Sequence, residues 1–202
     1  VALNFARFVV DKVILPRVDM EKEIIGNQNG GAGAVEFGVY VAVGLVIAAS
    51  TAGTGGAGFS DAQDSVLELA IRSLVFFGLG MVVLVLYSWF FQFTTPYDIH
   101  DEIAQNNVAV GVALAGNMIA IGLVTFKAVF GEFVGWSESL IAFFTLAVIG
   151  FVLLYVVRRL VDLILLPATK ISHELAVDRN LGVAFIVSAV VIGAALILNF
   201  AI

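Results

Sequence analysis

Long apolar runs separated by short polar stretches form the main pattern along this chain. Five of these runs reach the roughly 20 residues that a helix needs to cross a bilayer. They lie at about 31–50, 69–93, 108–131, 139–166 and 181–202. The pattern therefore predicts an all-α fold with five membrane-spanning helices.

A sixth apolar segment opens the chain, at residues 1–15, but it is too short to cross a membrane alone. Because it carries Arg7, Asp11 and Lys12, in isolation it resembles an interfacial helix. Aligning residues 1–16 with 152–167, however, superposes an Arg, an Asp and a Leu-Pro pair. We therefore expect the second half of a membrane helix here, with its first half upstream. The expected architecture is a polytopic membrane bundle of about six spans, with the first span truncated.

Three polar stretches, here called elbows, each join an incoming apolar run to a returning one; they are 16–29, 95–107 and 167–180. Each elbow ends in Asn, with a Glu five or six residues earlier and small residues four, nine and fifteen positions later. The pairs are Glu23 with Asn29, Glu102 with Asn107 and Glu174 with Asn180. The recurrence predicts three tandem helical-hairpin repeats within one membrane domain, at 1–50, 66–131 and 139–202.

The polar residues of the elbows have a structural explanation in a membrane. A returning helix leaves four backbone N–H groups unpaired at its start, and lipid offers them no water. Asn and Asp side chains accept from such groups, and carboxylates complement the positive end of the helix dipole. We therefore interpret the elbow cluster first as caps and anchors. Its members are Glu23, Asn29, Asp98, His100, Glu102, Asn107, Glu174, Asp178 and Asn180.

The two histidines, His100 and His173, stand beside elbow carboxylates, a combination that can hold a divalent metal or sense pH. Their spacing matches no dedicated metal motif. We therefore expect caps or solvent-facing side chains here, and we predict no metal and no other cofactor.

Charge predicts the orientation and excludes several classes of protein. Of the ten Lys and Arg residues, only Arg72 and Lys127 lie away from the elbows and their flanks. The positive-inside rule therefore places the elbows in the cytoplasm and the C-terminus outside a bacterial inner membrane. With 61% hydrophobic and 13% charged residues, the chain lacks the composition of a soluble protein. It has no cysteine, which excludes disulfides and thiolate catalysis, and its net charge of −6 disfavours nucleic-acid binding.

The second elbow and the helix after it combine a Tyr-Asp pair, an Asn, alternating Ala and several Gly. These residues are Tyr97, Asp98, Glu102, Asn107, Ala109, Ala113, Gly116 and Gly122. With this pattern, residues 94–202 resemble the bacterial domain-of-unknown-function 350 family, and the first hairpin does so more loosely. The third elbow departs from the pattern, with Asp178, Asn180 and Gly182 in place of a plainer Gly-Asn-x-Ala. The resemblance implies a helical inner-membrane protein, often linked to envelope stress operons, without an established reaction.

Two polar residues within the spans are candidates for an ion or proton site. Glu36 has no acidic counterpart in the other hairpins. It forms such a site, or it pairs with Arg72 or with a helix start. Asn117 either hydrogen-bonds a neighbouring helix, which we expect, or binds a solute.

Two classes of function remain. One is a membrane scaffold or assembly subunit, homo-oligomeric or part of a complex, that docks partners through cytoplasmic elbows. Its helices would pack through Gly111, Gly116, Gly122, Ala189 and Gly193. The other is a small cation or proton conduit lined by Glu36, Asn117 and elbow acids. The scarcity of polar residues in the spans favours the scaffold, and no residues resemble a nucleophile with its base, so we predict no enzyme.

Packing at small residues makes a direct mutational prediction. We expect Gly116→Leu to disrupt folding or assembly by overpacking, and we expect Leu at Val124 to be tolerated.

Overall fold

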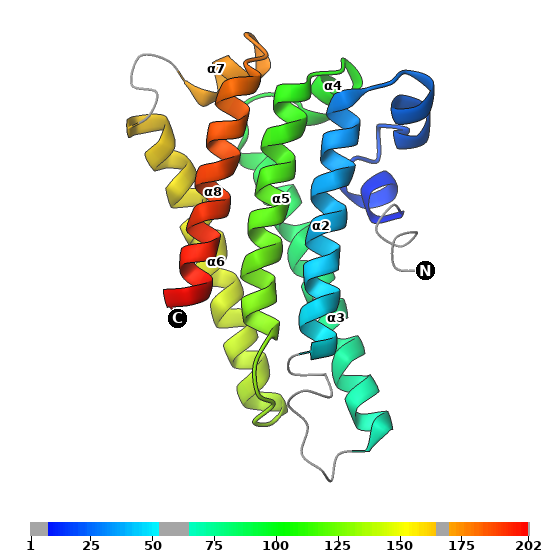
Figure 1. The fold of residues 1–202 in the computed structure, drawn as a ribbon, viewed down its shortest axis with the longest axis vertical. Helices are drawn as coiled ribbons and strands as arrows, with labels where there is room; N and C mark the ends of the chain where they lie inside the picture. The colour runs from blue at the N-terminus through cyan, green and yellow to red at the C-terminus, as the bar shows by residue number, and fades with distance from the viewer. Residues whose placement is uncertain (1–7, 53–64, 165–169, 202) are drawn as a thin grey trace.

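The computed structural model is a bundle of helices, and it describes residues 8–52, 65–164 and 170–201 (Figure 1). Within these residues the regular structure is entirely helical, as the hydropathy pattern predicts. Five helices are long and apolar enough to cross a membrane. They are α2 (Gly30–Ala52), α3 (Val66–Thr94), α5 (Val108–Val129), α6 (Trp136–Ile164) and α8 (Leu181–Ala201).

The remaining elements are short. In the opening segment, the described residues include a π-helix of five residues, η1 (Val10–Ile14). This helix is too short to cross a membrane, so the sixth span stays a prediction. Each elbow contains one short helix: η2 (Lys22–Gly26), α4 (Ile99–Ala104) and α7 (Ile171–Ala176). The elbow helices α4 and α7 lie at the same end of the bundle (Figure 1).

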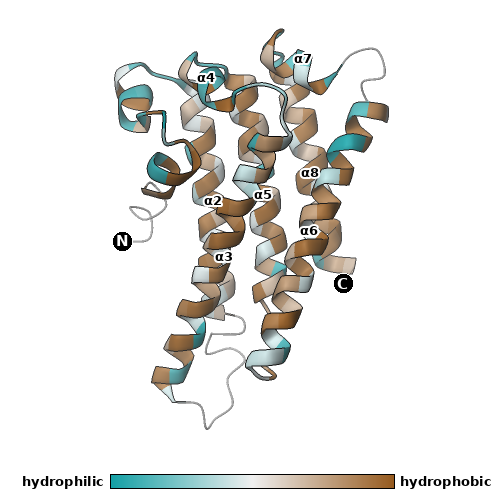
Figure 2. Cartoon of the chain, turned by 180° about the vertical axis from the view of Figure 1, so that it is seen from behind, coloured by the Kyte–Doolittle hydropathy of each residue, from teal (hydrophilic) through white to brown (hydrophobic). Residues whose placement is uncertain are grey.

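The long helices form two layers. The helices α8, α5 and α2 lie side by side in one layer, and Figure 2 shows α3 and α6 on the opposite side. Each helix of the first layer begins at the elbow end, so the three are parallel, and α5 packs against both α2 and α8. The surface of the bundle between its polar ends is largely apolar (Figure 2). This distribution suits lipid contact, because exposed apolar side chains cost no free energy in hydrocarbon.

Small residues bring the helices of the first layer into backbone contact. A Cβ atom at Gly122 would lie 2.8 Å from the Cα atom of Ala42 on α2, and one at Gly116 would lie 2.8 Å from the Cα atom of Ser188 on α8. A Cβ atom at Gly111 would meet the carbonyl oxygen of Gly31. Such close approach is the usual way in which membrane helices gain van der Waals contact.

The other two predicted packing residues, Ala189 and Gly193, lie elsewhere. Ala189 is exposed, and no described neighbour comes within 4 Å of a Cβ atom built at Gly193. Both are on the outer side of α8.

The expectation that Leu would be tolerated at Val124 rested on a surface-like position, and the structure contradicts that position. Val124 is 0% exposed, and a Cβ atom at Gly150 would meet its Cγ1 atom. The helices α5 and α6 therefore cross closely at this point, where a larger side chain would overpack.

Candidate functional site

Each elbow ends in the same arrangement of one Glu and one Asn, here called a clasp. The three clasps are Glu23 with Asn29, Glu102 with Asn107 and Glu174 with Asn180. In each, the Asn Nδ2 atom donates to the Glu Oε2 atom, at 2.9, 2.7 and 2.9 Å respectively. The Asn Oδ1 atom accepts from the backbone N–H three residues later, at 2.9, 3.2 and 3.2 Å. The Asn of each clasp therefore caps the returning helix, and the Glu holds that Asn side chain in place.

The backbone of the clasps is also shared. The backbone N–H of each clasp Asn donates to the carbonyl oxygen of its Glu, at 2.8 or 2.9 Å. The residue just before the Asn has a positive φ: 51° at Gln28, 57° at Asn106 and 50° at Arg179. For Gln28 and Arg179 this left-handed conformation costs roughly 1–2 kcal/mol, whereas an Asn such as Asn106 adopts it more readily. The three residue types differ, so the sequence carried no clear signal for this shared turn.

Two of the clasps also reach the next elbow. Asn29 Nδ2 donates to the carbonyl oxygen of Ile103 in α4 at 2.7 Å, and Asn107 Nδ2 donates to that of Leu175 in α7 at 2.9 Å. Asn29 and Asn107 are buried as a result, whereas Asn180 is exposed and its Nδ2 atom donates to Glu174. The elbows are therefore linked in series, and the third one ends the series.

Two exposed polar contacts reinforce the series. Arg17 in the first elbow forms a 3.1 Å ion pair with Asp98 in the second. Arg179 in the third elbow donates to the Oε1 atom of Gln105 in the second at 3.2 Å. Solvent-exposed contacts of this kind contribute little free energy, so the buried Asn side chains carry most of the linkage.

Hydrogen bonds set the electrostatics of the elbows. Hydrogen bonds donated by Asn29, and then by Asn27, hold the pKa of Glu23 below its usual range. Partial burial opposes ionisation of Asp98, but backbone amides of α4 outweigh it and lower the pKa of that carboxyl. Burial raises the pKa of the neighbouring Tyr97 to about 12, so its hydroxyl stays protonated. At neutral pH Asp98 is therefore a charged cap of α4, and Glu23 is a charged acceptor that holds the capping residue Asn29.

The two histidines lie in separate places. His100 Nδ1 is 3.3 Å from the Asp98 carboxylate, and His173 Nε2 is 3.6 Å from that of Asp178. Across the described ranges, no three His, Asp or Glu side chains come together as metal ligands would. The elbow residues therefore form three clasps and two His/Asp pairs, and not one convergent site.

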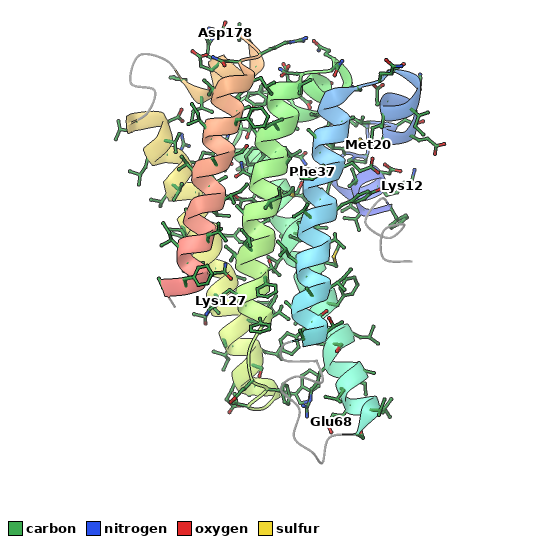
Figure 3. All side chains as sticks on the ribbon, viewed as in Figure 1. Lys12, Met20, Phe37, Glu68, Lys127 and Asp178 are labelled. Atoms are coloured by element: carbon green, nitrogen blue, oxygen red, sulfur yellow. The ribbon has the colours of Figure 1, made fainter. Side chains whose placement is uncertain are left out.

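Glu36 has a partner on its own helix. Its Oε1 atom accepts from the Tyr40 hydroxyl at 2.5 Å, and the side chain is half-buried. The alternative pairing with Arg72 is wrong, because α2 begins at the elbow end and α3 at the opposite end. In Figure 3 the labels of Phe37, next to Glu36, and Glu68 are correspondingly far apart. The Arg72 guanidinium donates to Glu68 at 2.6 Å.

Asn117 joins two helices, as the sequence predicts. It is 1% exposed; its Oδ1 atom accepts from the Tyr87 hydroxyl of α3 at 3.0 Å, and its Nδ2 atom donates to the carbonyl of Ala113 at 2.9 Å. Two similar contacts went unpredicted: Ser188 and Asn199 of α8 each donate to a carbonyl of α5 at 3.0 Å. Their signal was available, because a polar side chain in an apolar span usually bonds to a neighbouring helix.

Comparison with known proteins confirms the family that the sequence resembles. A family model described as Domain of Unknown Function (DUF350) matches residues 1–51 and 65–202. The chain belongs to the DUF350 family. It is 26% identical over 194 residues to a UPF0719 transmembrane protein of Aquifex aeolicus (strain VF5), a match that covers 94% of this chain and 67% of the relative. It is 28% identical over 131 residues to the UPF0719 transmembrane protein YshE of Bacillus subtilis (strain 168), covering 65% of this chain and 90% of the relative.

No solved structure matches the chain. The family and both relatives are described as transmembrane or of unknown function, so they support a bacterial membrane protein and leave its activity open.

Proposed function

We propose that this DUF350 protein is a non-enzymatic assembly subunit of the bacterial inner membrane. It is built from three tandem hairpin repeats, pairs with a second copy through α8, and presents its elbows to cytoplasmic partners. The observation that carries this proposal is a set of small residues that recurs on all three parallel helices. Two of the sets are covered by a neighbouring helix, and the third is open.

The set consists of three small residues, at positions 2, 9 and 13 after the clasp Asn, followed by a Leu at position 16. On α2 it is Gly31, Gly38, Ala42 and Leu45; on α5 it is Ala109, Gly116, Ala120 and Leu123; on α8 it is Gly182, Ala189, Gly193 and Leu196. The small members on α2 and α5 are buried against the next helix of the layer. On α8, Gly182 and Ala189 are exposed, and Leu196 is 41% exposed. The outer side of α8 therefore carries the residues that form helix contacts elsewhere in the layer, but no described helix packs against it.

The occupant we assign to this side is α8 of a second copy. A head-to-tail arrangement would place α8 against the outer side of α2, but Phe37 stands there, 62% exposed, at the position that Ala115 and Ser188 occupy on α5 and α8. Its ring prevents backbone contact. Ala189 and Gly193 instead form a small-xxx-small pair, which favours two parallel α8 helices about a twofold axis.

The polar groups within the spans also favour a structural protein over a conduit. The Asn117 amide accepts a hydrogen bond from the Tyr87 hydroxyl and donates one to the carbonyl of Ala113. The Glu36 carboxylate accepts from the Tyr40 hydroxyl. These contacts tie helices together or satisfy a lone polar group, as a scaffold requires.

Disulfide crosslinking tests the pairing directly, because the chain has no cysteine. Oxidation of membranes containing Ala189→Cys or Gly193→Cys should give a covalent dimer. Val148→Cys, on the lipid-facing side of α6 and 62% exposed, is the matched control and should stay monomeric. Equal crosslinking of all three variants, or none at positions 189 and 193, would contradict the proposal. A dimer formed only between Phe37→Cys and Ala189→Cys chains would replace it with a head-to-tail assembly.

Orientation needs its own measurement. Ala57, in the stretch between α2 and α3, and Ala168, in the third elbow, lie outside the described residues, so exposed described positions are used instead. Ile25 in the first elbow is 73% exposed, and Val134 at the opposite end is 69% exposed. An impermeant thiol reagent applied to intact cells should label Val134→Cys and spare Ile25→Cys. The reverse result would place the elbows outside the cell.

A further inference from the structure

A cavity opens beside the third elbow, and its lining carries more positive than negative charge. Its volume is about 780 Å³, and it lies between the last turns of α6, the end of α3 and the start of α7. Arg158, Arg159 and Lys170 line it, together with one acid, Asp162. The Asp162 Oδ1 atom accepts from the backbone N–H of Ile171 at 2.9 Å. Within the described parts of the chain, none of the three cations has a carboxylate within ion-pair distance.

Aromatic and hydroxyl groups hold the two guanidinium groups in place. Arg158 donates to the Thr95 hydroxyl at 2.9 Å and lies 4.4 Å from the centroid of the Phe91 ring. Arg159 donates to the Tyr155 hydroxyl at 3.0 Å. A guanidinium has five N–H donors, so most of them remain available on both residues. Arginines fixed in this way suit a tetrahedral oxyanion such as phosphate, because the planar fork loses little further entropy on binding.

The depth of the cavity in the membrane indicates the source of that phosphate. Arg158 follows Trp136, the first residue of α6, by 22 positions, which corresponds to roughly 33 Å along a helix. The hydrocarbon core of a bilayer is about 30 Å thick. With Trp136 at one interface, where Trp is enriched, Arg158 and Arg159 reach the headgroups of the other.

The surface of α6 provides a path for acyl chains. Val152, Val156 and Leu163 are 58%, 43% and 72% exposed. With Arg159 they are spaced by four, three and four residues, so all four lie on one face of the helix. A lipid whose headgroup binds Arg159 can therefore lay its chains along Val156 and Val152.

We propose that this cavity binds the phosphate headgroup of an anionic phospholipid. Arg158 forms the fixed wall, while Arg159 and Lys170 close on the phosphate from the exposed side. The lipid's chains lie along the apolar face of α6. This site is independent of the pairing of α8, because α6 and α8 expose different surfaces to lipid.

Native mass spectrometry of the full chain in mild detergent tests the site. Phosphatidylglycerol should be retained at one molecule per chain, at least about tenfold more tightly than phosphatidylcholine. The double variant Arg159→Gln/Lys170→Gln should remove this preference. Both side chains are exposed, so the variant should melt like the wild type when lipid is absent. If the variant retains phosphatidylglycerol as the wild type does, the site is wrong.

A matched double variant separates a site from general charge attraction. Lys12→Gln/Lys22→Gln removes the same charge from exposed positions outside the cavity, and it should leave the preference unchanged. An equal loss in both double variants would overturn the proposal in favour of non-specific attraction.

Competition with millimolar glycerol phosphate identifies the source of the phosphate. Displacement of the lipid by this soluble anion at comparable affinity would assign the cavity to a soluble phosphate compound and overturn the lipid assignment.

Discussion

The helices α5 and α8 carry the same set of small residues and meet different surroundings. Of an 18-residue apolar stretch of α5, 78% is buried inside the protein, compared with 39% for the corresponding stretch of α8. Gly116 on α5 touches Ser188, whereas Ala189, the corresponding residue of α8, is exposed. The pattern therefore identifies faces suited to helix contact, and the neighbours of each helix decide whether the contact forms within the chain.

The largest difference between these helices should appear on enlarging their glycines. A side chain at Gly116 would collide with the backbone of Ser188, so Gly116→Leu should cost on the order of 1–3 kcal/mol or more. Gly193→Leu, which meets no described neighbour, should leave the melting temperature of the monomer unchanged and weaken dimer formation. Thermal melting and size-exclusion chromatography in detergent measure the two effects. Equal melting temperatures for both variants would show that α5 is not the tightly packed member of the pair.

The clasps allow the same comparison with hydrogen bonds. Asn107→Ala removes the cap of α5 and leaves the carbonyl of Leu175 without its donor, so it should cost about 2 kcal/mol. Asn180→Ala removes only a cap and an exposed hydrogen bond to Glu174, and should cost about 1 kcal/mol or less. Melting temperatures of the two variants give the order. A larger loss for Asn180→Ala would mean that the link between elbows is not what stabilises the second clasp.

The first clasp should make stability depend on acid. The pKa of Glu23 is lower in the folded chain than in the unfolded one, because Asn29 and Asn27 donate to the carboxylate. Its contribution to stability is therefore complete above the unfolded pKa of about 4.3, and is lost as pH falls through the lower folded value. We expect the melting temperature to fall less steeply below about pH 4.3 in Glu23→Gln than in the wild type.

Asn27→Ala is the graded control for this pH dependence, since it removes only the second donor to Glu23. Its acid dependence should lie between those of the wild type and Glu23→Gln. Identical pH profiles in all three proteins would rule out a clasp contribution to acid stability.

The smallest effect is expected at Glu36. Glu36→Gln keeps an oxygen that accepts from Tyr40, so the melting temperature should change by little, and purified wild-type protein in proteoliposomes should conduct no ions. Tyr40→Phe removes the donor instead and is the control for the hydrogen bond. Reproducible cation or proton flux that Glu36→Gln abolishes would replace the scaffold with a conduit.

Hydropathy alone determined the class of this protein and the position of its five long helices. Transfer of an apolar run into lipid is a local property, so the run lengths sufficed for α2, α3, α5, α6 and α8. The capping role of the Glu/Asn pairs was also local, because the unpaired N–H groups lie within one helical turn of the Asn. The glycines of α5 were correctly recognised as contact residues for the same reason: close approach in a membrane requires small side chains.

Only the tertiary structure decided which partners these residues meet. The carbonyls that Asn29 and Asn107 reach are 74 and 68 residues away, and the order of α2, α5 and α8 in one layer brings them together. Val124 is buried because α6 crosses α5 at Gly150, which the apolar pattern of α5 does not reveal. Ala189 and Gly193 face outward because no described helix lies beyond α8. In each case the local chemistry is the same on several helices, and the free energy of packing depends on which helix stands alongside.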